Sequence, residues 1–201
     1  MEHAMIDDIA ESEPFGPFQR WFAEANRSEE LAETVMLATA TPAGVPSLRA
    51  VLLKSVDERG FVFYTNLESR KAAELFVNPH AALCFHWKSL RRQVRAEGVA
   101  ELVAEDEADG YFASRPRGSQ IAAWASDQSR PLENRNLLEK RVEMFAGRFA
   151  DRSIILRPNF WSGFRLLPNR VEFWQDQPSR LHDRLVFERA GTGWRRGRLF
   201  P

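Results

Sequence analysis

The sequence predicts an α+β fold, built on an antiparallel barrel or a strongly bent sheet with peripheral helices. Residues 34–103 consist mainly of β-rich runs separated by turn residues, residues 105–150 have helical patterns, and the remainder returns to short β-rich runs. Strands and helices are therefore grouped along the chain, whereas a doubly wound parallel sheet needs them to alternate regularly. A length of 201 residues suits one domain with a core of ordinary size.

The N-terminal part is expected to contain a tail, a helix and a β-meander. Residues 1–16 are predicted to be a flexible tail, because the segment is acidic and poor in large apolar residues, and residues 17–201 are expected to form the domain. Apolar residues recur at helical spacing from Phe18 onward, so the first helix is expected after Pro17. Turn residues then separate three runs, which predict strands over 34–41, 47–56 and 61–66.

The remaining elements follow from the same patterns. Ser69 is the expected N-cap of a short helix over 69–78, which Asn78 and Pro79 end. Helices are also expected over 105–115, 118–128 and 133–150. Further strands are expected over 81–87, 92–103, 160–168, 170–176, 184–190 and 194–200, the last four being separated by Pro-Asn, Gln-Pro-Ser and Gly-Thr-Gly.

Charge and motif content exclude several classes of function. The 28 basic and 28 acidic residues cancel, which argues against nucleic acid or an anionic membrane as a partner. No apolar run could span a bilayer and the acidic N-terminus does not resemble a signal peptide, so a cytoplasmic protein is expected. Cys84 is the single cysteine, and no HExxH, GxGxxG, P-loop or GxSxG motif occurs, so we expect no metal site, Rossmann site or covalent hydrolysis.

The first candidate anion site is YTNLESRKA, residues 64–72, where a strand leads through a polar turn into a helix. Free N–H groups at a helix start attract anions, and Arg70 and Lys71 add positive charge there. Basic residues are unfavourable in the first turn because of the helix dipole, which suggests a bound anion that offsets them. A surface helix that simply breaks this rule is the alternative.

The second candidate is SRPRGSQ, residues 114–120. Arg115 can bind a phosphate bidentately, Ser119 can donate its hydroxyl, and Tyr111 lies one helical turn before Arg115. The alternative is purely structural, with Pro116 ending one helix and Ser119 capping the next. The chain has no net charge, so two phosphate-like sites nevertheless favour a role in ligand binding over a purely structural one.

Two further stretches carry clustered cations. In RAVLLK, residues 49–54, Arg49 and Lys54 differ by an odd number of positions, so a regular strand would direct them to opposite faces. In EFWQDQPSRLHDR, residues 172–184, Arg180, His182 and Arg184 share a parity and would project to one side of an extended segment. A side with three potential cations costs free energy unless it faces water or a bound anionic or π-rich molecule.

Taken together, these motifs resemble the pyridoxine (pyridoxamine) 5′-phosphate oxidase family of flavin enzymes. The resemblance runs from about Pro17 to Pro201 and rests on RAVLLK, FYTNLESRKA, RRQVRAEG, YFASRPRGSQIAAWASDQS, EFWQ, RLHDR and the terminal RLFP. It implies a split β-barrel that binds FMN, a homodimer, and two FMN molecules at the subunit interface.

The resemblance also implies which residues bind each molecule. It assigns the FMN contacts to Arg49, Ala50, Val51, Leu52, Leu53, Lys54, Tyr64, Thr65, Arg70, Lys71, Gln93, Gln128, Ser129, Trp174 and Arg184. It assigns the substrate's phosphate and ring to Lys54, Tyr111, Arg115, Ser119, Arg180, Leu181 and His182. Arg180 and His182 are the candidate catalytic residues, which would hold the ring over the flavin and assist proton movement.

The implied reaction is oxidation of pyridoxine or pyridoxamine 5′-phosphate at the 4′ carbon, with two electrons passing to FMN and then to dioxygen, giving pyridoxal 5′-phosphate and hydrogen peroxide. Family members often carry an N-terminal lid with arginine and tyrosine, but here neither occurs before Arg20 and Tyr64, so no lid residue is assigned.

The alternatives are a related flavin oxidase of another aromatic substrate, such as a phenazine precursor, and a non-catalytic flavin or pyridoxal-phosphate binding module. A structural or nucleic-acid-binding barrel fits the neutral charge least.

Overall fold

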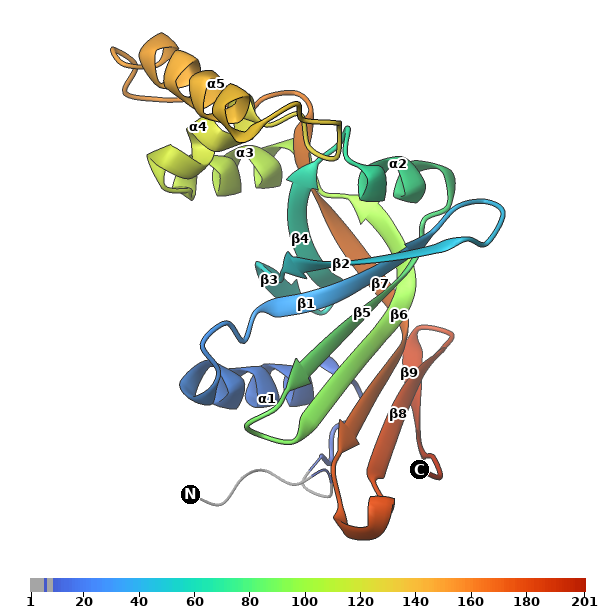
Figure 1. The fold of residues 1–201 in the computed structure, drawn as a ribbon. Helices are drawn as coiled ribbons and strands as arrows, with labels where there is room; N and C mark the ends of the chain where they lie inside the picture. Colours follow the sequence, from blue (N-terminus) through green and yellow to red (C-terminus); the bar gives the residue numbers. More distant parts are fainter. Residues whose placement is uncertain (1–5, 7–8) are drawn as a thin grey trace.

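A curled antiparallel sheet dominates the computed structural model, which describes residue 6 and residues 9–201 (Figure 1). In this part of the chain the strands are β1 (Thr34–Ala40), β2 (Pro46–Leu52), β3 (Ser55–Asp57), β4 (Gly60–Asn66), β5 (His80–Trp87), β6 (Arg92–Leu102), β7 (Trp161–Gln175), β8 (Asp183–Ala190) and β9 (Gly193–Arg198). The helices are α1 (Phe15–Ser28), α2 (Arg70–Val77), α3 (Glu105–Ser114), α4 (Arg117–Ala125) and α5 (Arg135–Arg148), with a 3-10 turn at Pro178–Arg180. The predicted α+β split-barrel architecture is confirmed.

Strand β7 organises the sheet. The strand order is β2-β1-β5-β6-β7-β4-β3, and the β8–β9 hairpin branches from β7. The first part of β7 pairs with β4, from Trp161 opposite Asn66, whereas the last part pairs with β8, up to Gln175 opposite Asp183. The helices α3 to α5 therefore lie near one end of β7 and the hairpin lies at the other (Figure 1).

The main core lies between α1 and the sheet. Phe18 contacts Phe61 of β4 and Phe85 of β5 in edge-to-face geometry, with ring centroids 4.9 and 5.0 Å apart. Trp21 packs edge-on against Phe173 of β7 at 5.2 Å. Aromatic contacts of this kind stabilise the fold by more than their buried area alone provides. Helix α1 therefore holds β4, β5 and β7 of the curled sheet together.

The described part of the predicted tail is packed rather than loose. Ile6 and Ile9 are each only 2 % exposed and belong to the main core, and Ile6 N–H donates to the Gln175 side chain at 3.0 Å. Helix α1 begins at Phe15, ahead of the expected start after Pro17. Two buried isoleucines in an acidic segment thus anchor it, whereas residues 1–5 and 7–8 of the predicted tail lie outside the described residues.

Two predicted strand boundaries were wrong. The run 47–56 breaks after Leu52, because Leu53 and Lys54 turn to pair with Glu33 and Val62 before β3 begins. Conversely, the predicted strands 160–168 and 170–176 are one strand, β7, despite Pro168. Glu97 pairs with Arg170 and the next residue, Gly98, pairs with Pro168, so Asn169 of β7 is the extra residue of a bulge beside the proline. Bulges are where prolines are tolerated inside sheets.

No helix in the described residues is long and apolar enough to cross a membrane. The same residues contain no group of three or more His, Cys, Asp or Glu side chains placed to hold a metal ion.

Candidate active site

A cavity of about 530 Å³ lies where the ends of β2 and β4 meet helices α2, α3 and α4. Eight of the predicted cofactor contacts line it: Ala50, Val51, Leu52, Lys54, Tyr64, Thr65, Lys71 and Gln128. Four predicted substrate contacts line the same cavity: Lys54, Tyr111, Arg115 and Ser119. The two candidate anion sites of the sequence are therefore neighbours in one cavity.

Lys71 supplies a buried cation at this cavity. Lys71 is 9 % exposed. Its Nζ donates to the hydroxyls of Thr65 and Ser69 at 2.9 and 3.2 Å and to Gln128 Oε1 at 2.8 Å. All three partners are neutral. Burial, aided by the nearby positive charge of Arg49, lowers the pKa of Lys71 from 10.5 to about 8. A bound anion would compensate this charge.

Arg115 presents a second cation that lacks an anionic partner. Its Nη1 is buried and has no hydrogen-bond partner within the described chain, and its guanidinium lies over the Trp161 ring, 4.8 Å from the centroid. Burial lowers the pKa of Arg115, although the group stays charged. Buried donors are nearly always satisfied, so this unpaired N–H is available to a ligand that enters the cavity.

The turn that carries Arg115 is fixed by its neighbours. Gln120 Nε2 donates to the carbonyls of Phe112, Ala113 and Arg115 at 3.0–3.1 Å, which satisfies the end of α3. Arg117 is occupied elsewhere, because its guanidinium donates to the carbonyls of Phe149 and Arg152 beyond α5. Of the two arginines in SRPRGSQ, one therefore faces the cavity and the other holds the helices together.

Three aromatic rings form one wall of the cavity. Tyr64 stacks on Tyr111 with centroids 3.9 Å apart and on Trp161 with centroids 5.3 Å apart. Burial raises the pKa of Tyr64 to about 12 and also raises that of Tyr111, so both hydroxyls are neutral donors at physiological pH. A flat apolar wall beside two cations suits a molecule with an aromatic ring and a phosphate.

Arg49 and Arg70 lie beside the cavity and share one carboxylate. Glu74, 6 % exposed, accepts from Arg70 Nε at 2.9 Å and Arg49 Nη2 at 3.3 Å, and also from the hydroxyls of Thr39 and Ser47. These hydrogen bonds lower the pKa of Glu74 to about 2. With Lys71, the cluster has three cations and one carboxylate, a net charge of two positive that matches a phosphate monoester dianion.

Two further predicted contacts near this end, Leu53 and Ser129, do not line the cavity, whereas Lys54 does. Leu53 is 4 % exposed and packs in the main core, so its side chain does not line the cavity. Ser129 follows Gln128 in a turn with φ of 71°, beside the cavity rather than on its wall. Lys54 lies on the wall with its Nζ 4.0 Å from Glu33, which is too far for a hydrogen bond, so its ammonium can turn to a ligand.

The remaining predicted contacts lie at the other end of β7. Gln93, Trp174 and Arg184 are side by side across β6, β7 and β8, and the His182 ring lies 4.6 Å from that of Trp174. Arg184 donates to Glu172 at 2.8 and 3.1 Å, and Leu181 is 69 % exposed. None of these residues lines the cavity that contains Lys71 and Arg115.

The expectation that Arg180, His182 and Arg184 project to one side was wrong. It required an extended segment, but Pro178–Arg180 forms a 3-10 turn in which Ser179 and Arg180 have φ of 57° and 62°. Strand β8 begins only at Asp183, so the period of two does not apply before it.

Sequence reasoning missed several cavity residues, most notably Trp161. It begins β7 and supports both Tyr64 and Arg115, but nothing in the sequence placed that strand start beside two distant helices. Asn66, Pro116, Ala122, Ala123 and Ser126 also line the cavity. The only available signal was their position within or beside the two anion-binding motifs.

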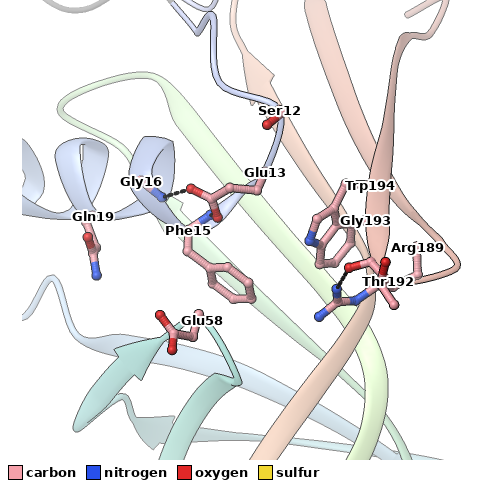
Figure 2. Close-up of a pocket in the computed structure, with 10 residues that line it drawn as sticks. All are labelled: Ser12, Glu13, Phe15, Gly16, Gln19, Glu58, Arg189, Thr192, Gly193 and Trp194. Atoms are coloured by element: carbon pink, nitrogen blue, oxygen red, sulfur yellow. Dashed lines mark hydrogen bonds between the residues drawn. The ribbon is translucent and has the colours of Figure 1, made fainter.

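A larger cavity, of about 660 Å³, lies between the start of α1 and the β8–β9 hairpin (Figure 2). Its arginine, Arg189, is already occupied, since it stacks on Trp194 at 4.4 Å and donates to the Thr192 carbonyl. Two carboxylates, Glu13 and Glu58, also line it. Among the described residues that line this cavity, no cation is free to bind a dianion, despite the size of the cavity.

Comparison with known protein families identifies two regions. Residues 23–148 match the family model described as pyridoxamine 5′-phosphate oxidase. Residues 161–201 match the model described as the pyridoxine 5′-phosphate oxidase C-terminal dimerisation region. The two matches cover both the cavity and the cluster around Trp174.

Similar proteins agree with these matches. The pyridoxine/pyridoxamine 5′-phosphate oxidase of Rhodospirillum rubrum is 55 % identical over 98 % of this chain and 100 % of its own length. That of Gluconobacter oxydans is 57 % identical over 94 % of this chain and 95 % of its own.

Two solved structures share the fold. The crystal structure of PhzG from Burkholderia lata 383, in complex with tetrahydrophenazine-1-carboxylic acid, has a TM-score of 0.92 and 31 % identity over 100 % of this chain and 98 % of that one. An FMN-binding protein from Nostoc punctiforme has a TM-score of 0.75 at 18 % identity, over 94 % of this chain and 98 % of that one.

Proposed function

The chain belongs to the pyridoxamine 5′-phosphate oxidase family, and from this premise we propose that it oxidises pyridoxine and pyridoxamine 5′-phosphates to pyridoxal 5′-phosphate with FMN as cofactor and dioxygen as electron acceptor. The single observation that carries this proposal is the cavity that Lys71 and Arg115 share. One buried and one half-buried cation without carboxylate partners, on one cavity with an aromatic wall, are what a pair of phosphorylated ring molecules requires.

The FMN phosphate is assigned to the cluster at the start of α2. Lys71, Arg70 and Arg49 provide the positive charge, and Thr65 and Gln128 hold the Lys71 ammonium in place. Bound FMN supplies the two-electron redox chemistry that the side chains of this protein lack. The protein's contribution is therefore to bind, orient and exclude water.

The substrate phosphate is assigned to Arg115, Ser119, Tyr111 and Lys54. Arg115 Nη1 is the donor without a partner, and the neutral hydroxyls of Tyr111 and Ser119 are on the same cavity wall. Because transfer of two electrons needs the reacting atoms within about 3–3.5 Å, this clamp would fix the 4′ carbon of the substrate against the flavin.

The ring contacts are assigned to a partner subunit. Trp161 at the cavity and Trp174 beside His182 are 13 positions apart on β7, which corresponds to roughly 40 Å of extended strand. One subunit cannot easily enclose one flavin with both ends of this strand. The match of residues 161–201 to a dimerisation region supports a homodimer, in which Arg180, His182, Gln93, Trp174 and Arg184 of one subunit complete the cavity of the other.

The experiment that tests the proposal is an aerobic assay of the purified protein with FMN and each phosphorylated vitamer. Formation of the aldehyde product together with hydrogen peroxide is the expected result. Absence of product with both vitamers, from a protein that binds FMN, would refute the proposed reaction.

A second candidate follows from the likeness to PhzG, whose crystal structure contains tetrahydrophenazine-1-carboxylic acid, and it is the oxidation of a phenazine precursor. Such a substrate carries no phosphate and would not need Lys54, Tyr111, Arg115 and Ser119 together on the cavity wall. Competition between a reduced phenazine carboxylate and pyridoxine 5′-phosphate in the same assay distinguishes the two. Faster turnover of the phenazine would favour this second function.

A further inference from the structure

Asp176 connects the predicted catalytic histidine, His182, to Arg91. It follows the end of β7 and lies between two side chains: its Oδ1 is 3.0 Å from His182 Nδ1, and its Oδ2 accepts from Arg91 Nε at 2.6 Å and from Arg91 Nη2. The sequence motifs gave Asp176 no role.

The position of the Asp176 carboxylate is set by its main chain as well as by its side chain. Asp176 N–H donates to the Arg91 carbonyl at 3.0 Å, in addition to the paired side-chain hydrogen bonds. Arg91 itself lies in the β5–β6 turn with φ of 55°, and its N–H donates to the Lys88 carbonyl at 3.1 Å. Because both Arg91 donors go to Oδ2, the other carboxylate oxygen, Oδ1, is left to face the imidazole.

His182 Nδ1 has two neighbours that demand opposite proton positions. Gln177 N–H lies 3.2 Å away and could only donate to a bare Nδ1, whereas the Asp176 carboxylate, 3.0 Å away, could only accept from a protonated one. A hydrogen bond to a charged group is about twice as strong as a neutral one, so the carboxylate decides. The imidazole proton then lies on Nδ1.

We propose that Asp176 is a positioning residue that holds His182 in the Nδ1-protonated tautomer, with its ring against Trp174, so that bare Nε2 is left to accept a proton or hydrogen bond from the substrate. Within the described residues no hydrogen bond to Nε2 is found, which leaves that atom available. The importance of this tautomer for turnover rests on the proposed function, but the tautomer itself does not.

Nuclear magnetic resonance of the holoenzyme labelled with ¹⁵N-histidine tests the tautomer directly. Long-range ¹H–¹⁵N correlations distinguish the two neutral tautomers in a buffer alkaline enough for ordinary imidazoles to be neutral. The chain has 4 histidines, and the His182→Asn variant identifies the signal of His182. The expected result is a protonated Nδ1 and a bare Nε2. A wild-type protein with the proton on Nε2 would overturn the proposal.

The isosteric variant Asp176→Asn sharpens the test. Because Arg91 requires an oxygen, the new amide would direct its NH₂ group at His182 and donate to Nδ1, which forces the proton onto Nε2. Asp176→Ala would give the same tautomer, since Gln177 N–H is then the remaining partner. An unchanged spectrum in both variants would contradict the proposed role of Asp176.

Kinetics separate positioning from a merely structural role. We expect kcat to fall about tenfold or more in both Asp176 variants, because a well-placed proton-transfer group contributes about 10²–10⁴ to the rate. KM and FMN affinity should stay within about twofold, since the phosphate clamps are untouched. Glu139→Gln, which removes an exposed ion pair with Arg135 on α5, is the matched control and should leave kcat unchanged.

The outcomes also distinguish this proposal from the proposed function. Wild-type kcat in the Asp176 variants together with a low kcat in His182→Asn would overturn the positioning role. Wild-type kcat in His182→Asn would instead refute the proposed catalytic role of His182, and the spectrum would then decide the role of Asp176 alone.

Discussion

Replacing Lys71 with methionine tests the assignment of the FMN phosphate. Methionine keeps much of the length and packing of lysine but removes the charge and its three donors. Since Lys71 is 9 % exposed and hydrogen-bonded only to neutral groups, its charge is poorly solvated before FMN binds. The fall of its pKa from 10.5 to about 8 corresponds to roughly 3 kcal/mol of unfavourable free energy for the charged form.

Bound phosphate would turn this unfavourable charge into a favourable interaction. Hydrogen bonds to charged groups are worth about 1.5–3 kcal/mol, which corresponds to a 10- to 150-fold change in Kd. We therefore expect the FMN Kd of Lys71→Met to rise by about 10- to 150-fold. Riboflavin has the same ring and no phosphate, so its Kd should stay within about twofold.

The pH dependence gives the same assignment a second readout. Lys71 of the unliganded protein loses its proton near pH 8, so FMN affinity of the wild type should fall as the pH rises above 8, and Lys71→Met should lack this fall. An unfolded chain keeps the proton up to about pH 10.4, so the free energy of unfolding of the unliganded protein should rise with pH between 8 and that value. The rise should also be missing in the variant.

Quenching of flavin fluorescence measures both affinities on the same protein samples. Lys140→Met, an exposed lysine on α5, is the matched control and should change neither affinity. Equal losses of FMN and riboflavin affinity in Lys71→Met would show that the lysine supports the fold of the cavity rather than the phosphate. An unchanged FMN Kd would refute the assignment outright.

Three other substitutions test separate parts of the structure. Arg115→Ala should raise the apparent KM for the phosphorylated vitamers about tenfold or more while the protein stays yellow with FMN, and loss of the flavin instead would show that the two phosphate sites are exchanged. Glu74→Gln should lower the free energy of unfolding by up to about 3 kcal/mol at pH 7, because the pKa of Glu74 is held at about 2 instead of 4.5. Urea denaturation measures this difference from wild type, which should shrink as the pH falls below 4.5. A difference that stays constant with pH would contradict the ion-pair account. Gly98→Ala should destabilise the protein by about 1–3 kcal/mol or more, since its Cβ would lie 2.0 Å from the Leu167 carbonyl oxygen, whereas Gly147→Ala meets no atom within 4 Å and should be neutral or stabilising in thermal denaturation.

Much of the candidate site could be predicted because its chemistry is local in the sequence. Arg70 and Lys71 at one helix start, and Arg115 with Ser119 at the next, are each within a few residues of one another. Their meeting in one cavity is not local. It depends on β4 pairing with the start of β7, which brings Tyr64 and Trp161 together from positions almost a hundred residues apart. The family resemblance supplied that connection, and spacing alone did not.

The errors in the fold have the same origin. Pro168 ends a strand by local rules, but Asn169 beside it is left unpaired in a bulge, so β7 continues through the proline opposite Gly98. Ser179 and Arg180 take positive φ values that local rules reserve mainly for glycine, so the turn between β7 and β8 could not be foreseen. Ile6 packs in the main core, and its N–H donates to the side chain of Gln175, 169 positions away. Each case is decided by a partner distant in sequence.

The most direct test of the central claim, that one cavity holds two phosphates, is a crystal structure of the protein with FMN and pyridoxal 5′-phosphate bound together. The account predicts the flavin phosphate at Lys71, the pyridoxal phosphate at Arg115, and His182 of the partner subunit at the pyridine ring. Both phosphates bound away from these two side chains, or either molecule bound in the cavity between α1 and the β8–β9 hairpin instead, would contradict it.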